Sequence, residues 1–283
     1  MIGDYLATFS TKLKPVSDTP FLDVSVLLAN LLGKSRSWIL AHPEVPLLHE
    51  QRQSLEDAIL RLEAGEPLPY VIGHWEFFGL DFLLNSATLI PRPETELVVE
   101  QALEWLHKHA GKRTVVDLGT GSGCIAVTLA HQIAGLQVIA TDISARALQA
   151  AKTNAARHGV SERVRFVQSN LLDGIRGSFD IICANLPYIP THVLHSLRVY
   201  KKEPELALDG GSDGLDLIRS LLFTAPQHMN RGGRLLIEFE MNQAHAVSNL
   251  AKAVFPQQDI HVHRDLSGRE RLLVVDRVVP SGS

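Results

Sequence analysis

Thr114-Val-Val-Asp-Leu-Gly-Thr-Gly-Ser-Gly123 joins an apolar run to three glycines that alternate with small polar residues. The run from Thr114 to Leu118 predicts a buried strand, and the apolar stretch from Cys124 to His131 predicts a helix directly after the glycines. Glycines at such a junction let the backbone pass close to a ligand at the N-terminus of a helix. The stretch therefore predicts an α/β fold that binds a small molecule at this loop.

An acidic residue follows at the spacing expected for a ribose contact. Val138-Ile-Ala-Thr-Asp142 predicts the next strand, and Asp142 comes about twenty residues after the glycines, where a carboxylate can meet ribose hydroxyls. The spacing G-x-G-x-G differs from the G-x-G-x-x-G of dinucleotide enzymes. It resembles the loop that receives S-adenosylmethionine in class I methyltransferases. The alternative is a glycine-rich turn without a ligand.

A second polar motif ends another predicted strand. The apolar run Phe179-Asp-Ile-Ile-Cys-Ala184 precedes Asn185-Leu-Pro-Tyr188, so Asn185 falls at the carboxyl end of a strand, where open α/β sheets bind ligands. The Asn185 amide oxygen and the Leu186 carbonyl offer two acceptors for both protons of a planar NH2 group, and Tyr188 offers a flat apolar wall. The pattern Asn-x-Pro-Tyr resembles the active-site loop of methyltransferases that act on amide or exocyclic amino nitrogens. An ordinary turn containing Asn and Pro is the structural alternative.

The composition is that of a globular enzyme. The chain has 283 residues, of which 45% are hydrophobic, enough for one large core or two domains. Its apolar runs stop well short of the roughly 20 residues needed to cross a bilayer, and no signal-peptide pattern opens the chain, so we expect a cytoplasmic protein without membrane contact. The net charge of −4 argues against a broad nucleic-acid surface. Neither the two cysteines, Cys124 and Cys183, nor the thirteen histidines show the spacing of a metal site.

The apolar pattern divides the chain into three parts. Residues 1–65 contain three stretches of helical periodicity, which are Phe21 to Leu32, Ser35 to Ala41 and Leu48 to Ala64. Within residues 66–92, two short runs flank Gly79 and predict a β-hairpin. Residues 93–279 begin with Pro93 and nearby acids, which favour a helix start, and hold the motifs described above. We expect a helical substrate-recognition domain, a hairpin linker and a catalytic domain.

Several longer segments together resemble one methyltransferase family. Ile90-Pro-Arg-Pro-Glu-Thr-Glu96 matches a family segment without change. Three further segments resemble family segments, which are Glu203-Pro-Glu-Leu-Ala-Leu-Asp-Gly-Gly211, Asp213-Gly-Leu215 and Asp265-Leu-Ser-Gly-Arg269. With the helical domain, the hairpin and the Asn-x-Pro-Tyr loop, they cover nearly the whole chain. The chain thus resembles the peptide chain release factor glutamine N5-methyltransferases, the PrmC or HemK family.

This resemblance implies a class I, Rossmann-like methyltransferase core, with S-adenosylmethionine as cofactor. It implies methyl transfer to the amide nitrogen of a glutamine in the GGQ-type loop of peptide chain release factors, without direct nucleic-acid contact. The cofactor contacts that it implies are Asp117, Gly119, Thr120, Gly121, Ser122, Gly123, Asp142, Asn170, Leu171 and Asn185. The catalytic residues that it implies are Asn185, Pro187 and Tyr188, and the substrate contacts are these three with Leu186, Arg92 and Glu94.

The sequence departs from the family pattern at two places. Leu186 stands where the family usually has proline, and no glycine stands near Phe239 or Glu240, where the family tends to have one. Because Asn-Leu-Pro-Tyr is equally at home in ribosomal RNA adenine dimethyltransferases, an adenine-N6 methyltransferase acting on RNA or DNA is one alternative. A ribosomal-protein glutamine methyltransferase is another. A non-catalytic cofactor-binding module is the third, and the intact Asn185 and Tyr188 weigh against it.

Overall fold

The computed structural model describes residues 1–111 and 114–278, and the chain divides into two compact units. The helical unit runs from Met1 to His74, and the sheet unit begins at Trp75. Residue 279, the expected limit of the catalytic domain, lies outside the described residues. No helix in the described ranges is both long and apolar enough to cross a membrane.

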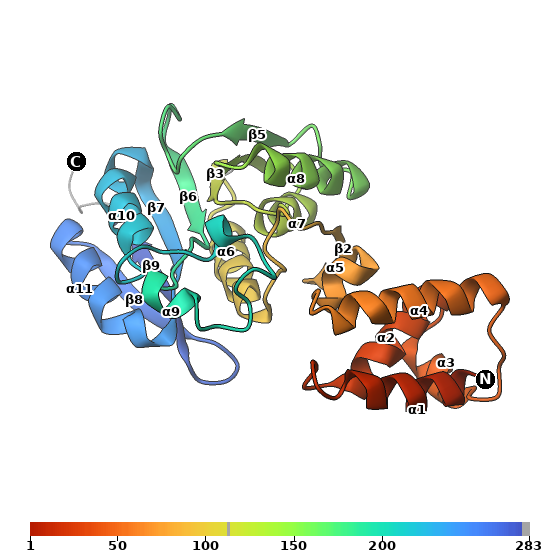
Figure 1. Cartoon of the computed structure of the whole chain (residues 1–283). Helices are drawn as coiled ribbons and strands as arrows, with labels where there is room; N and C mark the ends of the chain where they lie inside the picture. The colour runs from red at the N-terminus through yellow and green to blue at the C-terminus, as the bar shows by residue number, and fades with distance from the viewer. Residues whose placement is uncertain (112–113, 279–283) are drawn as a thin grey trace. The chain divides into compact units, whose positions relative to one another are not determined.

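Helices build the first unit (Figure 1). They are α1 (Ile2–Leu13), α2 (Pro20–Leu32), α3 (Arg36–Ala41), α4 (His49–Glu63) and α5 (Leu68–Ile72). The three helices predicted from periodicity are confirmed as α2, α3 and α4, whereas α1 and α5 were not predicted. The helical unit extends past Gly65 because α5 contacts α2 and α4.

The core of the helical unit forms because each longer helix presents one apolar stripe. On α1 the buried residues Ile2, Leu6, Phe9 and Leu13 recur at helical spacing and pack with the buried stripes of α2 and α4. Gly33 ends α2 in the left-handed conformation, with φ of 60°, which glycine adopts without steric cost. Most of the stability of these helices therefore comes from packing their apolar stripes together.

A seven-stranded sheet forms the centre of the second unit. Its strands are β3 (Thr114–Leu118), β4 (Gln137–Asp142), β5 (Val164–Gln168), β6 (Phe179–Ala184), β7 (Met229–Glu238), β8 (Asp259–Arg264) and β9 (Glu270–Asp276). They lie in the order β5-β4-β3-β6-β7-β9-β8, and all pairs are parallel except those that β9 makes with β7 and β8. The strands predicted at 114–118, 138–142 and 179–184 are confirmed as β3, β4 and β6. Because β3 pairs with both β4 and β6, the strand order reverses beside it, and such a switch point is where open sheets bind ligands.

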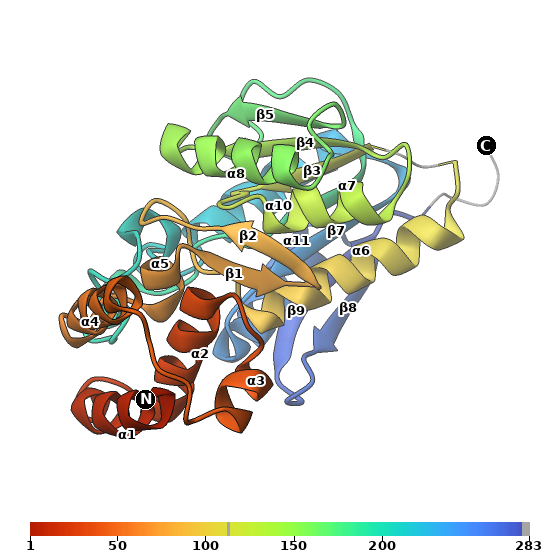
Figure 2. The same cartoon turned by 90° about the vertical axis from the view of Figure 1, so that its right-hand side faces the viewer.

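Helices cover both faces of this sheet (Figure 2). One face carries α6 (Glu96–Lys108), α7 (Cys124–Gln132) and α8 (Ala145–Arg157), and the other carries α10 (Asp216–His228) and α11 (Ala244–Val254). The shorter elements are α9 (Thr191–Leu194) and the 3-10 turns η1 (Pro93–Thr95), η2 (Glu205–Ala207) and η3 (Met241–Gln243). The predicted helix start is confirmed, because Pro93 opens η1 and α6 follows at once.

The central strands are mostly apolar on both sides because both faces of the sheet are covered. Every residue of β6 is buried, as expected for a parallel strand between two helical layers. Val116 and Leu118 on β3 belong to the apolar core that includes residues of α10 and α11. Since successive side chains of a strand alternate in direction, Asp117 faces the opposite layer, where its carboxylate accepts a hydrogen bond from the Ala126 amide of α7.

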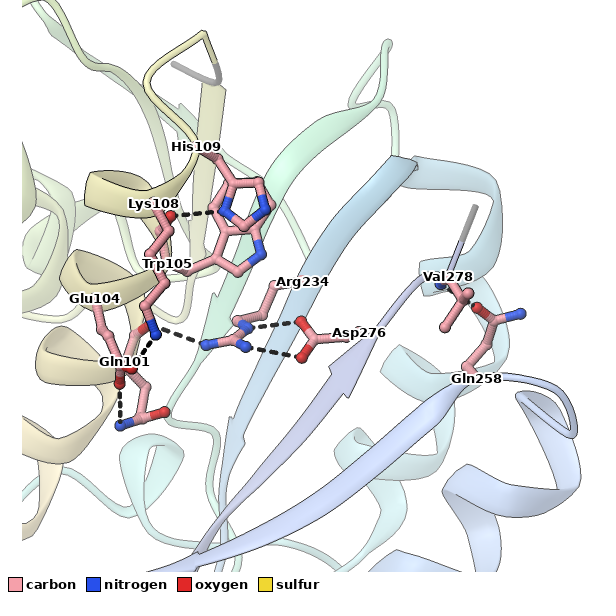
Figure 3. A network of polar contacts seen from close by, with 9 residues as sticks. All are labelled: Gln101, Glu104, Trp105, Lys108, His109, Arg234, Gln258, Asp276 and Val278. Carbon is pink, nitrogen blue, oxygen red and sulfur yellow. Dashed lines mark hydrogen bonds and ion pairs between the residues drawn. The ribbon is translucent and has the colours of Figure 1, made fainter. Parts of the chain in front are cut away.

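A polar network ties α6 to the antiparallel strands (Figure 3). Arg234 on β7 donates from Nε and Nη2 to the two carboxylate oxygens of Asp276 on β9, each at 2.7 Å. Its Nη1 donates to the Gln101 carbonyl of α6 at 3.3 Å. A two-pronged arginine–carboxylate pair of this kind fixes orientation as well as charge, so it holds the reversed strand β9 in register against β7.

A buried asparagine connects the hairpin to α8 and to the glycine loop. The strands β1 (His74–Phe77) and β2 (Leu80–Leu83) confirm the predicted hairpin, and both turn residues have positive φ, as a two-residue type I′ turn requires. Asn154 on α8 accepts a hydrogen bond from the Leu83 amide at 2.8 Å. It also donates to the Leu83 carbonyl at 3.0 Å and to the Ser122 carbonyl at 2.9 Å. A single side chain thus links the hairpin, α8 and the glycine loop.

Replacing this residue should destabilise the protein. Asn154→Ala leaves one buried N–H and two carbonyls without a partner, and we expect the free energy of unfolding to fall by about 3 kcal/mol. Urea denaturation measures this as a lower midpoint with an unchanged slope. Asn249→Ala, an exposed position on α11, is the matched control and should leave the midpoint almost unchanged.

Candidate active site

A cavity of about 320 Å³ lies at the switch point of the sheet. Loops that follow three neighbouring strands line it, through Gly119 and Gly121 after β3, Asp142 at the end of β4, and Asn185 after β6. Its size falls within the usual range for small-molecule sites. The motifs that the sequence analysis singled out therefore meet at one place.

The loop after β3 has three positions that favour glycine. Gly119, Gly121 and Gly123 have φ of 67°, 56° and 85°, the left-handed region that glycine tolerates. A Cβ atom on Gly119 would lie 3.3 Å from Leu186 Cδ2, and one on Gly123 would lie 3.1 Å from Ala151 Cβ. The loop thus runs close to both the β6 loop and α8.

Asp117 supports this loop through hydrogen bonds at the end of β3. Its Oδ2 accepts hydrogen bonds from the Thr120 hydroxyl at 2.6 Å and from the Ala126 amide at 3.2 Å. Burial raises the pKa of Asp117 to about 7. Among the described residues, no donor bonds to Asp117 Oδ1 or to the Ser122 hydroxyl oxygen, which are both buried. Asp117, Thr120, Ser122 and Gly123 do not line the cavity, in contrast to Gly119 and Gly121.

Asp142 lines the cavity directly. Its Oδ2 accepts a hydrogen bond from the Gly121 amide at 2.9 Å, and its Oδ1 accepts one from the Ser144 amide at 2.8 Å. Burial raises the pKa of Asp142 despite these bonds. Each carboxylate oxygen has a second lone pair, so the side chain can still accept hydrogen bonds from a ligand.

The predicted residues after β5 also lie here. Asn170 and Leu171 line the cavity, and Leu171 has φ of 50°, which is rare for a leucine. Strained backbone of this kind costs free energy and clusters at ligand sites. The predicted contact residues of three different loops, after β3, β4 and β5, therefore share one cavity.

A smaller cavity of about 90 Å³ adjoins the first. Asn185, Leu186 and Pro187 line both cavities, while Tyr188 and Arg92 line only the smaller one. The Asn185 Nδ2 donates to the Thr95 hydroxyl oxygen at 2.8 Å. No donor within residues 1–111 and 114–278 bonds to Asn185 Oδ1 or to the Leu186 carbonyl. The wall between the cavities thus carries the two free acceptors that the sequence predicted.

A glycine-rich segment holds the Asn185–Tyr188 loop from behind. A Cβ on Gly210 would lie 2.7 Å from the Pro187 carbonyl oxygen, and a Cβ on Gly214 would lie 2.2 Å from that of Tyr188. Gln243 Nε2 donates to the same Tyr188 carbonyl at 2.9 Å. These contacts explain why glycines follow Glu203-Pro-Glu-Leu-Ala-Leu in this sequence.

Arg92 and Glu94 have different environments. Arg92 Nη2 donates to Oε1 of the buried Glu203 at 2.5 Å, and the Ile90 amide donates to Glu203 Oε2 at 3.0 Å. Glu203 thereby fastens the segment before α6 to the wall of the smaller cavity. Glu94 is half-buried and lines neither cavity.

Sequence reasoning missed two buried polar residues behind the wall, Thr95 and Glu238. Each is 2% exposed. Burial raises the pKa of Glu238 to about 7, and the neighbouring Thr95 and Tyr188 side chains offset this rise only in part. The sequence does contain a signal for Glu238, because this residue ends the apolar run of β7, as Asp142 ends that of β4.

Comparison with known proteins gives the same picture. A family model described as the PrmC N-terminal domain matches residues 4–73, and one described as the methyltransferase small domain matches residues 96–199. The chain is 42% identical to the release factor glutamine methyltransferase of Moorella thermoacetica, over 92% of each chain. It is 38% identical to that of Coxiella burnetii, over 98% of this chain and 99% of the relative.

Solved structures agree on the fold. A methyltransferase from Pyrococcus furiosus aligns with a TM-score of 0.53 and 19% identity, over 79% of this chain and 98% of its own. The catalytic domain of hMettl16 aligns with a TM-score of 0.58 and 14% identity, over 82% of this chain and 83% of its own. The predicted α/β class I methyltransferase fold is therefore confirmed.

The cavity makes a prediction about Asp142. Asp142→Ala removes the bond to the Gly121 amide and the carboxylate that we expect to accept from ribose hydroxyls, so we expect S-adenosylmethionine to bind more weakly by about 1.5 to 3 kcal/mol. Titration calorimetry measures the change. Asp173→Ala, the same charge change at an exposed site, is the control, and equal affinities for both variants would remove Asp142 from the cofactor site.

Proposed function

Because this chain belongs to the release factor glutamine methyltransferase family, we propose that it methylates the side-chain amide nitrogen of a glutamine in a peptide chain release factor. The observation that carries the proposal is the wall between the two cavities. There, Asn185 Oδ1 and the Leu186 carbonyl remain free to accept both protons of one NH2 group. A cytoplasmic location, with the release factor as protein partner, is part of the same proposal.

S-adenosylmethionine is the methyl donor. When bound, it supplies a methyl group that is activated by a sulfonium. The residues present fit it: Gly119 and Gly121 border the cavity without side chains, and Asp142 keeps lone pairs for ribose hydroxyls. We assign the larger cavity to this cofactor, with Asn170 and Leu171 on its wall.

The smaller cavity is assigned to the glutamine side chain. An amide nitrogen is a poor nucleophile because its lone pair is delocalised into the carbonyl. Asn185 and the Leu186 carbonyl would fix the NH2 plane and direct the nitrogen at the methyl group, and such positioning lowers a barrier by several kcal/mol, of the order of 7 or more in the best cases. The same acceptors would stabilise the positive charge that develops on nitrogen. Tyr188 forms the adjacent aromatic wall.

The two departures from the family pattern do not favour an adenine substrate. Leu186 is a buried packing residue against Gly119, and its acceptor is the backbone carbonyl, which proline also has. At the second departure, Phe239 is fully buried and Glu240 has φ of −76°, an ordinary value that needs no glycine. Both changes therefore affect side-chain packing, and neither removes an acceptor from the proposed site.

The helical unit is proposed to recognise the protein substrate, as the sequence analysis expected of residues 1–65. Phe21, Leu48 and Leu60 are large apolar side chains that are more than half exposed there. A cavity of about 320 Å³ also opens among residues of α2, α4 and α5. Exposed apolar surface of this kind supports contact with a partner, and a glutamine amide alone carries too little information to select one protein.

Asn185 provides the test of the chemistry. Asn185→Ala should leave the affinity for S-adenosylmethionine near that of the wild type. It should slow methyl transfer to the release factor by about a hundredfold or more, which is the usual cost of removing one oriented polar group that stabilises a transition state. Mass spectrometry of the glutamine-containing peptide gives the rate. Asn242→Ala, which changes an exposed residue of η3, is the control. Wild-type turnover by Asn185→Ala would refute the proposal that Asn185 holds the NH2 group of the glutamine.

Removal of residues 1–73 tests the role of the helical unit. We expect the shortened chain to keep its cofactor affinity and its rate on a short glutamine peptide, but to methylate an intact release factor at least about tenfold more slowly. Parallel reactions contain ribosomal RNA. Label in RNA adenine would instead support the adenine-N6 alternative, and equal rates on the intact factor would reject the recognition role.

A further inference from the structure

Thr95 lies at the start of a helix without capping it. It is the last residue of η1, directly before α6, and is 2% exposed. A threonine at the start of a helix usually accepts a hydrogen bond from an amide of the first turn. Here η1 runs directly into α6, so Thr95 already has helical φ and ψ of −67° and −21°, and within the described residues its side chain makes no capping bond. Helix formation therefore does not account for the Thr95 hydroxyl.

The Thr95 hydroxyl contacts the acceptor loop. Asn185 Nδ2 donates to Thr95 Oγ1 at 2.8 Å, and the two residues are ninety positions apart in the sequence. In the part of the chain that the structure describes, the Asn185 side chain has no second hydrogen-bond partner. A side-chain amide has a donating end and an accepting end. With its NH2 group on Thr95, Asn185 keeps its oxygen free at the wall of the two cavities that it lines.

The direction of this amide decides what the wall can bind. In the proposed function, the two protons of the glutamine NH2 group need two acceptors, which are Asn185 Oδ1 and the Leu186 carbonyl. An Asn185 amide turned by half a rotation would direct its own NH2 group at that of the substrate, and two donors do not bond to each other. The Thr95 oxygen opposes this turn because it accepts from Nδ2, and a buried NH2 group without this acceptor would be left unpaired. The bond to Thr95 thus keeps both acceptors available to one NH2 group.

The segment that carries Thr95 is anchored on both sides. Before it, Arg92 Nη2 donates to the buried Glu203 at 2.5 Å, and the Thr95 amide donates to the Arg92 carbonyl at 3.1 Å. After it, Glu96 Oε1 accepts a hydrogen bond from the Phe78 amide of the hairpin turn at 2.9 Å. A side chain on a segment that is held at both ends can fix the position of another side chain.

We propose that Thr95 is a positioning residue, whose hydroxyl holds the Asn185 amide with its oxygen toward the glutamine NH2 group. Thr95 lines neither cavity, so it acts through Asn185 and does not touch the substrate. This inference rests on the proposed function, because it assigns how the acceptor site keeps its orientation.

Thr95→Val tests this role because it removes the hydroxyl and nearly keeps the shape of the side chain. We expect the single-turnover rate of methyl transfer to a release factor, with saturating S-adenosylmethionine, to fall at least about tenfold, which is part of the loss expected when an oriented polar group is removed. The affinity for S-adenosylmethionine should be unchanged. Thr95→Ser keeps a hydroxyl at the same place and should restore most of the rate.

Thr128→Val is the matched control. Thr128 on α7 is also buried, with 0% exposure. Its hydroxyl has no hydrogen-bond partner among the described residues, so the same substitution removes no bond there. Thr128→Val should transfer at the wild-type rate. If thermal unfolding shows that Thr95→Val does not fold, Thr95→Ala takes its place, because it removes the same hydroxyl.

A double-mutant cycle with Asn185→Ala separates positioning from general packing. Because Thr95 acts through Asn185, Thr95→Val should cause no further loss of rate in a chain that already carries Asn185→Ala. A packing role would instead lower the rate by the same factor in both backgrounds. Such additive losses, or a wild-type rate in Thr95→Val, would overturn the inference. Absence of glutamine methylation by the wild-type chain would overturn the proposed function instead, so the two failures are distinguishable.

Discussion

The parallel pairing of β3 with both β4 and β6 is the constraint on which the site depends. It places the carboxyl ends of three strands at one edge of the sheet, and the loops that carry Gly119, Gly121, Asp142 and Asn185 to the larger cavity leave from there. Covering helices on both faces make these strands mostly apolar. Polar residues of the site stand at or just after strand ends, as Asp142, Asn185 and Glu238 do.

Much of this arrangement could be predicted from the sequence because its signals are local. An apolar run that ends in glycines, in Asp142 or in Asn185 identifies both a strand and its functional end, and all three strands were found. The helix α1 also has a local signal, the spacing of Ile2, Leu6, Phe9 and Leu13, which was overlooked. By contrast, α5 has five residues and begins beside prolines, too short for periodicity to reveal.

The parts that could not be predicted are contacts between distant segments. Thr95 meets Asn185 across ninety residues, and Glu203 meets Ile90 and Arg92 across more than a hundred. No spacing rule identifies such pairs. The glycine loop was predicted as a whole, but only the structure separates Gly119 and Gly121, which line the cavity, from Asp117, Thr120 and Ser122, which hold the loop in place.

The shared wall of Asn185, Leu186 and Pro187 has a consequence for inhibitor design. Because one stretch of backbone borders both cavities, a single molecule could fill them together if its two halves were joined beside this wall, where we propose that the methyl group is transferred. Such a bisubstrate compound would bind its second half at high effective concentration once the first was in place. It would also require the particular acceptor cavity of this chain, so its selectivity among methyltransferases would come from the smaller pocket and not from the widely used cofactor fold.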